Sequence, residues 1–317
     1  NSQPSEGLRA LMQSNKAKKE FSISDLVFVI GPRINAAGRM DDARNAVKLL
    51  ISPSAIHATD NAEILNKHNI NRREFDTSIT DEALVMLQDD PDQNVKKSTV
   101  LFQPHWHKGV IGIVASRLID KYYRPTIILT ESNGFATGSA RSVAGFNIYE
   151  AILSCSDLLE QFGGHMFAAG LTMRLENITA FTQRFEEVVS STIEERYLTP
   201  EIEINATLEM EDITTKFSSL LKQFEPFGPQ NMKPAFLTTA VQDTGWSRIV
   251  GTDHLKFSLK KGKGSLNGIG FGMGAHLELV KSGQPFDICY NLDENEWNDT
   301  KKIEMTVKDV RSVTNLI

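Results

Sequence analysis

Residues 98–141 read STVLFQPHWHKGVIGIVASRLIDKYYRPTIILTESNGFATGSAR and decide the fold of the middle of the chain. β-Branched and apolar residues bounded by turn residues predict strands at 98–103, 125–130 and 134–141. Apolar residues spaced three and four apart predict a helix at 110–123, between the first two strands. Strands that alternate with helices are typical of an α/β domain.

The same alternation continues downstream. We expect a helix at 147–162, a strand at 167–175 and a second helix at 178–197, which begins after Asn177 as its capping residue. The alternation therefore predicts an α/β domain over residues 95–197.

The segments on either side of this domain have different patterns of apolar and turn residues. A long helical pattern runs from Ala55 to about Leu87 with few apolar positions, so we expect this helix to connect domains with one face in solvent. After Pro200, short alternating runs separated by Gly, Asn and Asp predict a small antiparallel barrel at 198–317, with the OB fold favoured.

Composition limits the class of function. The 317 residues are 40% hydrophobic and 23% charged, with a net charge of −6, so no general positive field attracts nucleic acid and any anion site must be local. The two cysteines, Cys155 and Cys289, are too few for a disulfide framework and indicate a reduced, cytoplasmic protein. No apolar run reaches the roughly 18 residues of a membrane span, so no membrane partner is expected.

In the segment GPRINAAGRMDDA (31–43) neither helix nor strand patterning dominates. Its candidate phosphate-binding groups are the guanidiniums of Arg33 and Arg39 and the amide of Asn35. The alternative is a loop in which these arginines pair with carboxylates such as Asp41 and Asp42.

The segment ATGSARS (136–142) places Ser139 and Arg141 two residues apart. On a strand both side chains point to one face, where a hydroxyl and a guanidinium can bind one phosphate. The alternative is an edge strand whose arginine lies in solvent.

The segment EQFGGHMFAAG (160–170) follows a predicted helix, so Gly163 or Gly164 would be its left-handed cap. Capping needs one glycine and leaves the second unexplained. His165 could donate a hydrogen bond to a phosphate, or it could be a packed histidine.

The segment HWHKGVIG (105–112) contains His105 and His107, but no third metal ligand lies at a suitable spacing. We favour a helix N-terminus that follows Gly109 and attracts an anion, with His107 facing that site or capping the helix. The chain also lacks the carboxylate cluster that metal-dependent phosphodiester hydrolysis needs, so we predict no catalytic residue and no metal ligand within it.

Aromatic and basic residues of the barrel could bind single-stranded nucleic acid by stacking and by contacts to the backbone. The alternative is that at least half of the aromatic residues form the barrel core. The candidates are Trp246, Phe257, Phe271, Tyr290 and Trp297 with Lys256, Lys260, Lys261 and Lys263, of which we select Trp246, Lys256, Lys260, Lys261 and Trp297.

Five motifs together resemble the RecJ family of bacterial single-strand-specific exonucleases, within the DHH phosphoesterase superfamily. They are GPRINAAGRM, HWHKGVIGIVASRL, ATGSARS, FGGHMFAAGLTM and EPFGPQNMKPAF. The resemblance covers nearly the whole chain and implies the tail of a DHH domain at 1–50, a connecting helix at 51–90, a DHH-associated α/β domain at 91–197 and an OB fold at 198–317. It implies a 5′→3′ exonuclease of single-stranded DNA in repair and recombination that uses Mn²⁺ or Mg²⁺.

The resemblance also implies roles for residues. Ser139, Arg141 and the turn from Gly163 to His165 would bind the DNA backbone, with Arg33 on the same surface. The metal ligands of the family lie in Asp-x-Asp and Asp-His-His motifs that this chain lacks, so it is expected to bind no metal and to be inactive alone. Single-stranded DNA is the implied partner, and a single-strand-binding protein or a helicase are candidate protein partners.

One departure from the family pattern is FGPQNMKPAF, where Gln230 and Met232 replace the Gly and Pro that usually flank the Asn, which affects the shape of that turn. Two other functions stay open. One is a non-catalytic module that binds single-stranded nucleic acid or a protein. The other is a DHH-type phosphoesterase on short oligonucleotides or cyclic dinucleotides, which the C-terminal barrel disfavours.

Overall fold

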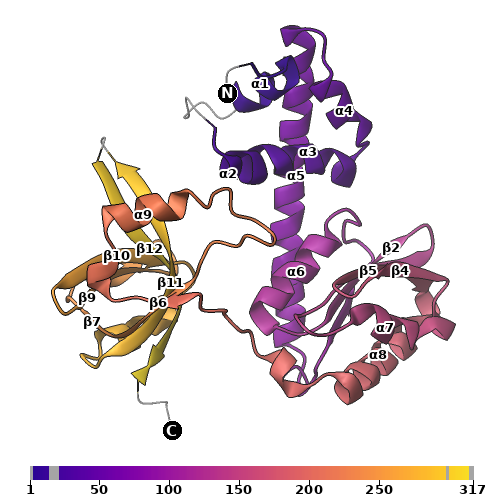
Figure 1. The fold of residues 1–317 in the computed structure, drawn as a ribbon. Helices are drawn as coiled ribbons and strands as arrows, with labels where there is room; N and C mark the ends of the chain where they lie inside the picture. The colour runs from indigo at the N-terminus through magenta and orange to yellow at the C-terminus, as the bar shows by residue number, and fades with distance from the viewer. Residues whose placement is uncertain (1–2, 14–20, 298–299, 314–317) are drawn as a thin grey trace. The chain divides into compact units, whose positions relative to one another are not determined.

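The computed structural model describes residues 3–13, 21–297 and 300–313, with the side chains of 295–301 outside that description. The chain divides into two compact units, Asn1–Pro200 and Glu201–Ile317, and each is described by itself. In the first unit, a bundle of short helices and an α/β sandwich both pack along one long helix, α5 (Figure 1). None of the described helices is long and apolar enough to cross a membrane.

The helix α5 (Ala55–Gln88) confirms the long helix predicted from the sequence. Its N-terminus is capped by Ser54, whose side chain accepts a hydrogen bond from the backbone of His57. Its first half contacts three of the short helices and its second half contacts α6. The short helices are α1 (Glu6–Gln13), α2 (Ile23–Asp25), α3 (Gly31–Met40) and α4 (Arg44–Leu50), with a π-helical turn at Leu26–Ile30.

The loop considered at 31–43 as the alternative is wrong for most of its length, because Gly31–Met40 is the helix α3. Pro32 lies in the first turn, where its missing N–H costs nothing. Ala36 and Ala37 are fully buried, and α3 packs on α5. Burial of small residues against a neighbouring helix therefore outweighs the weak helical pattern of this segment.

The α/β domain contains a five-stranded sheet in the order β1-β2-β3-β5-β4, in which β1 and β2 are parallel and the other pairs antiparallel. The helix α6 (Ile111–Tyr122) covers one face, where Ile128 joins its core. The helices α7 and α8 cover the other face, where Ile127 and Leu129 join theirs. The strand bounds are β1 Thr99–Phe102, β2 Thr126–Ser132, β3 Phe135–Arg141, β4 Gln161–His165 and β5 Ala168–Arg174.

The predicted strands and α6 are confirmed, but the helix predicted at 147–162 is wrong in its second half. The helix α7 spans only Ile148–Leu153, and a 3₁₀ turn follows at Ser156–Leu158. The next residues form β4, which pairs with β5 along its full length. Two glycines in this segment disfavour a helix, and the free edge of β5 offers a ladder of hydrogen bonds instead.

The helix α8 (Ile178–Thr192) begins where expected, but Asn177 does not cap it. The Asn177 side chain donates to the backbone oxygen of Leu158 instead. Asn177 therefore fastens α8 to the turn before β4.

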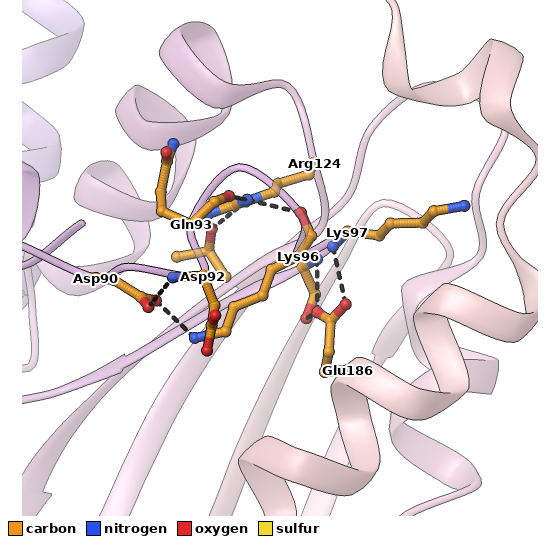
Figure 2. A network of polar contacts seen from close by, with 9 residues as sticks. Asp90, Asp92, Gln93, Lys96, Lys97, Arg124 and Glu186 are labelled. Carbon is orange, nitrogen blue, oxygen red and sulfur yellow. Dashed lines mark hydrogen bonds and ion pairs between the residues drawn. The ribbon is translucent and has the colours of Figure 1, made fainter. Parts of the chain in front are cut away.

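Buried polar contacts fix the edge strand β1 (Figure 2). The guanidinium of Arg124, only 5% exposed, donates to the backbone oxygens of Gln93 and Lys96 at 2.6 and 2.7 Å. The Glu186 carboxylate of α8 accepts from the backbone N–H groups of Lys97 and Ser98 at 2.9 Å. These contacts join the end of α5 to both layers of the domain.

The second unit is a barrel. Five strands, in the order β7-β11-β12-β10-β9, close on themselves because β7 also pairs with β9 through Gln242 and Lys260. Its core includes Phe257, Phe286 and Tyr290, all fully buried. This architecture agrees with the predicted OB fold. The strand bounds are β6 Ala206–Thr207, β7 Phe236–Asp243, β8 Arg248–Val250, β9 His254–Lys261, β10 Gly264–Gly270, β11 Phe286–Trp297 and β12 Thr300–Ser312, with helices α9 Thr215–Lys222 and α10 Leu277–Lys281.

Candidate nucleic-acid interface

Two rows of paired residues cross the sheet from β3 through β5 to β4. Ser139 pairs with Gly170, and Gly170 pairs with Gly163. Two residues along, Arg141 pairs with Ala168, which pairs with His165 in turn. Paired residues and residues two apart share a face of a sheet. The structure therefore brings Ser139 and Arg141 to one face, as the sequence predicts, and places His165 on that face as well.

Glycines keep this face open next to Ser139. A methyl group added to Gly163 would meet no atom within 4 Å, and one added to Gly170 would come no closer than 3.9 Å to the backbone oxygen of Gly138. A shallow pocket of about 470 Å³ lies here. It is lined by Lys108, Thr137, Gly138, Gln161, Phe162, Gly163, Gly170, Leu171 and Thr172.

The neighbouring Gly164 has a different role, and neither glycine caps a helix as predicted. Gly164 has φ +154°, and a methyl group there would lie 2.3 Å from the backbone oxygen of Ala168. Gly164 thus permits the close approach of β4 to β5, whereas Gly163 leaves space for a ligand.

The first turn of α6 lies against the same face. A methyl group on Gly112 would be 2.7 Å from Nη2 of Arg141 and 2.9 Å from Oγ of Ser139. Arg141 Nη1 donates to that Oγ atom at 2.9 Å and to the backbone oxygen of Ala140 at 2.7 Å. The positive end of a helix dipole thus adds to the charge of the guanidinium.

A second guanidinium reaches the same place from α3. Arg39 Nη1 donates to the backbone oxygen of Gly109 at 3.0 Å, and a methyl group on Gly109 would lie 2.0 Å from the backbone oxygen of Arg39. Burial and the nearby Arg39 lower the pKa of Arg141. Within the described residues neither arginine forms an ion pair with a carboxylate, and Asp42 pairs with Arg44 instead. Two such guanidiniums favour an anion between them.

Asn35 and Arg33, the other two candidates on α3, differ in exposure and contacts. Asn35 is exposed one turn before Arg39, on the same side of the helix. Arg33 donates to Asn66 Oδ1 and to the backbone oxygen of Val29, both at 2.6 Å. Burial and the nearby Arg73 lower the pKa of Arg33. These contacts hold the Arg33 guanidinium against α5 through Asn66.

His165 is exposed at the end of β4. Its Nδ1 atom accepts a hydrogen bond from the backbone N–H of Phe167 at 3.2 Å. In the neutral ring that leaves Nε2 as the proton donor toward a ligand.

Sequence reasoning missed a second group of arginines around α5. Asp76 is fully buried and accepts from Arg117 Nη2 at 2.7 Å and from Arg72 Nη1 at 3.3 Å. Burial lowers the pKa of Arg72, Asp76 opposes this effect, and Arg39 is among the cations that lower it further. The spacing of Arg72 and Asp76, four apart on a helix, was the available signal.

The two histidines before α6 have separate partners. His105 Nε2 lies 3.0 Å from a carboxylate oxygen of Glu82. His107 Nδ1 accepts from the backbone N–H of Gly109 at 3.1 Å and so fixes the loop that enters the helix. In the part of the chain that the structure describes, no three His, Cys, Asp or Glu side chains gather to hold a metal ion, so we assign no metal ligand here.

The barrel candidates divide into surface and core. Lys256 and Lys260 are exposed on β9, and Trp246 is 74% exposed before β8. Lys261 is held by Glu209 at 2.7 Å. Phe257 and Tyr290 belong to the core, in line with the alternative for the aromatic residues, while Phe271 is exposed and Lys263 is exposed in the turn after β9. The side chain of Trp297 lies outside the described residues.

Each of the two units contains a domain that matches a known protein family. Residues 92–191 match the model of the DHHA1 domain, and residues 204–309 match that of the RecJ OB domain. The chain belongs to the RecJ family. RecJ of Bacillus subtilis, a single-stranded-DNA-specific exonuclease, is 35% identical over 89% of this chain and 36% of its own length. RecJ of Escherichia coli is 29% identical over 96% of this chain and 54% of its own.

A solved RecJ structure has the same fold over nearly the whole chain. The crystal structure of Thermus thermophilus RecJ in complex with Mg²⁺ superposes with a TM-score of 0.82 at 29% identity and covers 97% of this chain. That match covers 46% of the Thermus RecJ chain, so this chain spans about half or less of the RecJ proteins it resembles. The DHH-associated α/β domain followed by an OB-type barrel is confirmed.

Proposed function

We propose that this chain holds single-stranded DNA for a RecJ-type 5′→3′ exonuclease of DNA repair and recombination. The observation that carries the proposal is the open face where Ser139, Arg141 and His165 share one side of the sheet. Arg39 and the N-terminus of α6 supply further positive charge. The relatives named single-stranded-DNA-specific exonucleases support this substrate class.

The geometry fits a backbone phosphate. Arg141 and Arg39 neutralise charge on the phosphate oxygens, and the Ser139 hydroxyl and the His165 Nε2–H donate to them. The missing side chains of Gly163 and Gly170 let the strand come close to the sheet. Thermus RecJ has been solved with Mg²⁺ and with Mn²⁺, which supports a divalent metal in the whole enzyme. The described residues of this chain supply no ligand set for such an ion.

The barrel supplies a second contact. Lys256 and Lys260 point outward on β9, and Arg248 of β8 pairs with Lys256 of β9. With the exposed Trp246 they form a basic, partly aromatic surface of the kind that tracks a single strand. A single-strand-binding protein or a helicase as partner, and a cytoplasmic location, stay predictions.

Fluorescence anisotropy of a labelled single-stranded oligonucleotide with the purified chain tests the proposal. We expect binding that weakens steeply with salt, weaker binding of duplex DNA, and no competition by a cyclic dinucleotide. Addition of Mn²⁺ should leave the oligonucleotide intact. Absence of binding at low salt would overturn the proposal, and competition by the cyclic dinucleotide would favour a small-substrate phosphoesterase.

A further inference from the structure

An aromatic pair, distinct from the residues assigned to phosphate binding, lies beside the phosphate-binding face. Phe75 of α5 stacks on His107 of the loop before α6, with ring centroids 5.1 Å apart and an interplanar angle of 30°. Phe75 is 42% exposed, although its neighbour Asp76 is fully buried. Phe75 belongs to none of the hydrophobic clusters of the described residues. Part of a large apolar ring is therefore available to a ligand.

The ring pair is fixed to the same turn as Arg39. His107 Nδ1 accepts from the backbone N–H of Gly109 at 3.1 Å, which fixes the imidazole behind Phe75. The backbone oxygen of Gly109 accepts from Arg39 Nη1 at 3.0 Å. One short loop thus links the aromatic pair to a guanidinium of the phosphate-binding face.

A second cation adjoins Phe75 on its own helix. Arg72 lies one turn earlier and is held by Asn69 Oδ1 at 3.0 Å and Asp76 Oδ2 at 3.3 Å. Arg39 and Arg117 are close enough to lower the pKa of Arg72, after the larger effect of burial. The surroundings of the ring are therefore cationic, as a site for a nucleotide requires: a π-face for the base and positive charge for the backbone.

We propose that Phe75, supported by His107, is the stacking surface for one nucleobase of the bound strand. The inference rests on the proposed function, since it places the base beside the phosphate held by Arg39 and Arg141. Stacking on an aromatic ring tolerates any base, so this subsite contributes affinity and register without sequence preference.

The test uses a set of oligonucleotides, each with a single abasic position, in the anisotropy assay with the whole chain. We expect one abasic position to weaken binding by the unmodified chain about tenfold. Phe75→Leu should weaken binding of the complete oligonucleotide by a similar factor and lose any further response to that abasic position. Phe75→Trp should retain both the affinity and the response.

Phe28→Leu is the matched control, because Phe28 is 73% exposed in the same unit, on the π-helical turn Leu26–Ile30, and has no aromatic partner in the described structure. It should bind and respond like the unmodified chain. An unmodified chain that binds the complete strand without any abasic-position dependence overturns the stacking site alone. So does a Phe75→Leu variant with unchanged response. Failure of the unmodified chain to bind any strand overturns the proposed function instead.

Discussion

Arg141 and His165 lie in one row of the sheet, separated only by Ala168 of the strand between them. Neighbouring strands are about 4.8 Å apart, so the two side chains stand roughly 10 Å from each other on the same face. In the neighbouring row, Ser139 pairs with Gly170, which pairs with Gly163. Donors at both ends of one row, beside a row of two glycines, form a site for an elongated anion such as a nucleic-acid backbone.

The two adjacent glycines of β4 should respond differently to alanine. Gly163→Ala should fold normally, because its methyl group meets no atom within 4 Å, and should weaken oligonucleotide binding by filling the open face. Gly164→Ala should lower the free energy of unfolding by about 1–3 kcal/mol, because its methyl group would lie 2.3 Å from the Ala168 oxygen. Urea unfolding and anisotropy separate the two effects. Normal binding by folded Gly163→Ala would argue against a ligand on this face.

Two adjacent lysines of β9 offer a similar comparison in the barrel. Lys260→Ala should weaken binding and reduce the slope of log affinity against log salt by about 0.7, because one phosphate contact of a single strand is lost. Lys261→Ala should have a smaller effect, since Glu209 already holds this ammonium group at 2.7 Å. Equal salt slopes for both variants would contradict a strand path over Lys260.

Burial should make the stability of the first unit depend on alkaline pH. Full burial raises the pKa of the Cys155 thiol to about 11, above the unfolded value of about 8.5. The folded state therefore keeps a proton that the unfolded state releases, so this contribution is present below pH 8.5 and is lost as pH rises to 11. Urea unfolding at pH 7.5 and pH 10 should show a loss about 2 kcal/mol larger than in Cys155→Ala. An identical loss in both proteins would contradict this assignment.

Gln230 has φ +69° in a tight turn closed by two hydrogen bonds of 2.9 Å between Gly228 and Asn231. The departure from the family pattern is thus accommodated by strain, because a Cβ atom disfavours this conformation. Gln230→Gly should raise the free energy of unfolding by about 1 kcal/mol. Gln230→Ala, which keeps the Cβ atom, should change it little. A destabilised glycine variant in urea unfolding would refute the explanation.

The features that were predicted correctly depend on the spacing of residues close together in the sequence. The two-residue period of β3 put Ser139 and Arg141 on one face, and the helical period predicted α5 and α6. The edge strand β4 was missed because its conformation comes from pairing with β5, which no local pattern records. The helix α3 was missed because burial of its alanines against α5 stabilises it.

The composition of the site was predictable only in part for the same reason. The contact between Arg39 and Gly109 joins residues 70 positions apart. Neither segment alone indicates this contact. The buried carboxylate of Asp76, which fixes Arg72 and Arg117, also depends on how α5 packs against α6.

The central claim is that Arg141 binds a backbone phosphate of single-stranded DNA. The most direct measurement is the salt dependence of oligonucleotide binding by the unmodified chain, by Arg141→Ala, and by Arg174→Ala, whose guanidinium is paired with Glu160 at 2.9 Å. Arg141→Ala should bind more weakly, with a slope against log salt reduced by about 0.7, while Arg174→Ala should match the unmodified chain. Arg141→Ala with unchanged affinity and slope, in a protein that still folds, would contradict the claim.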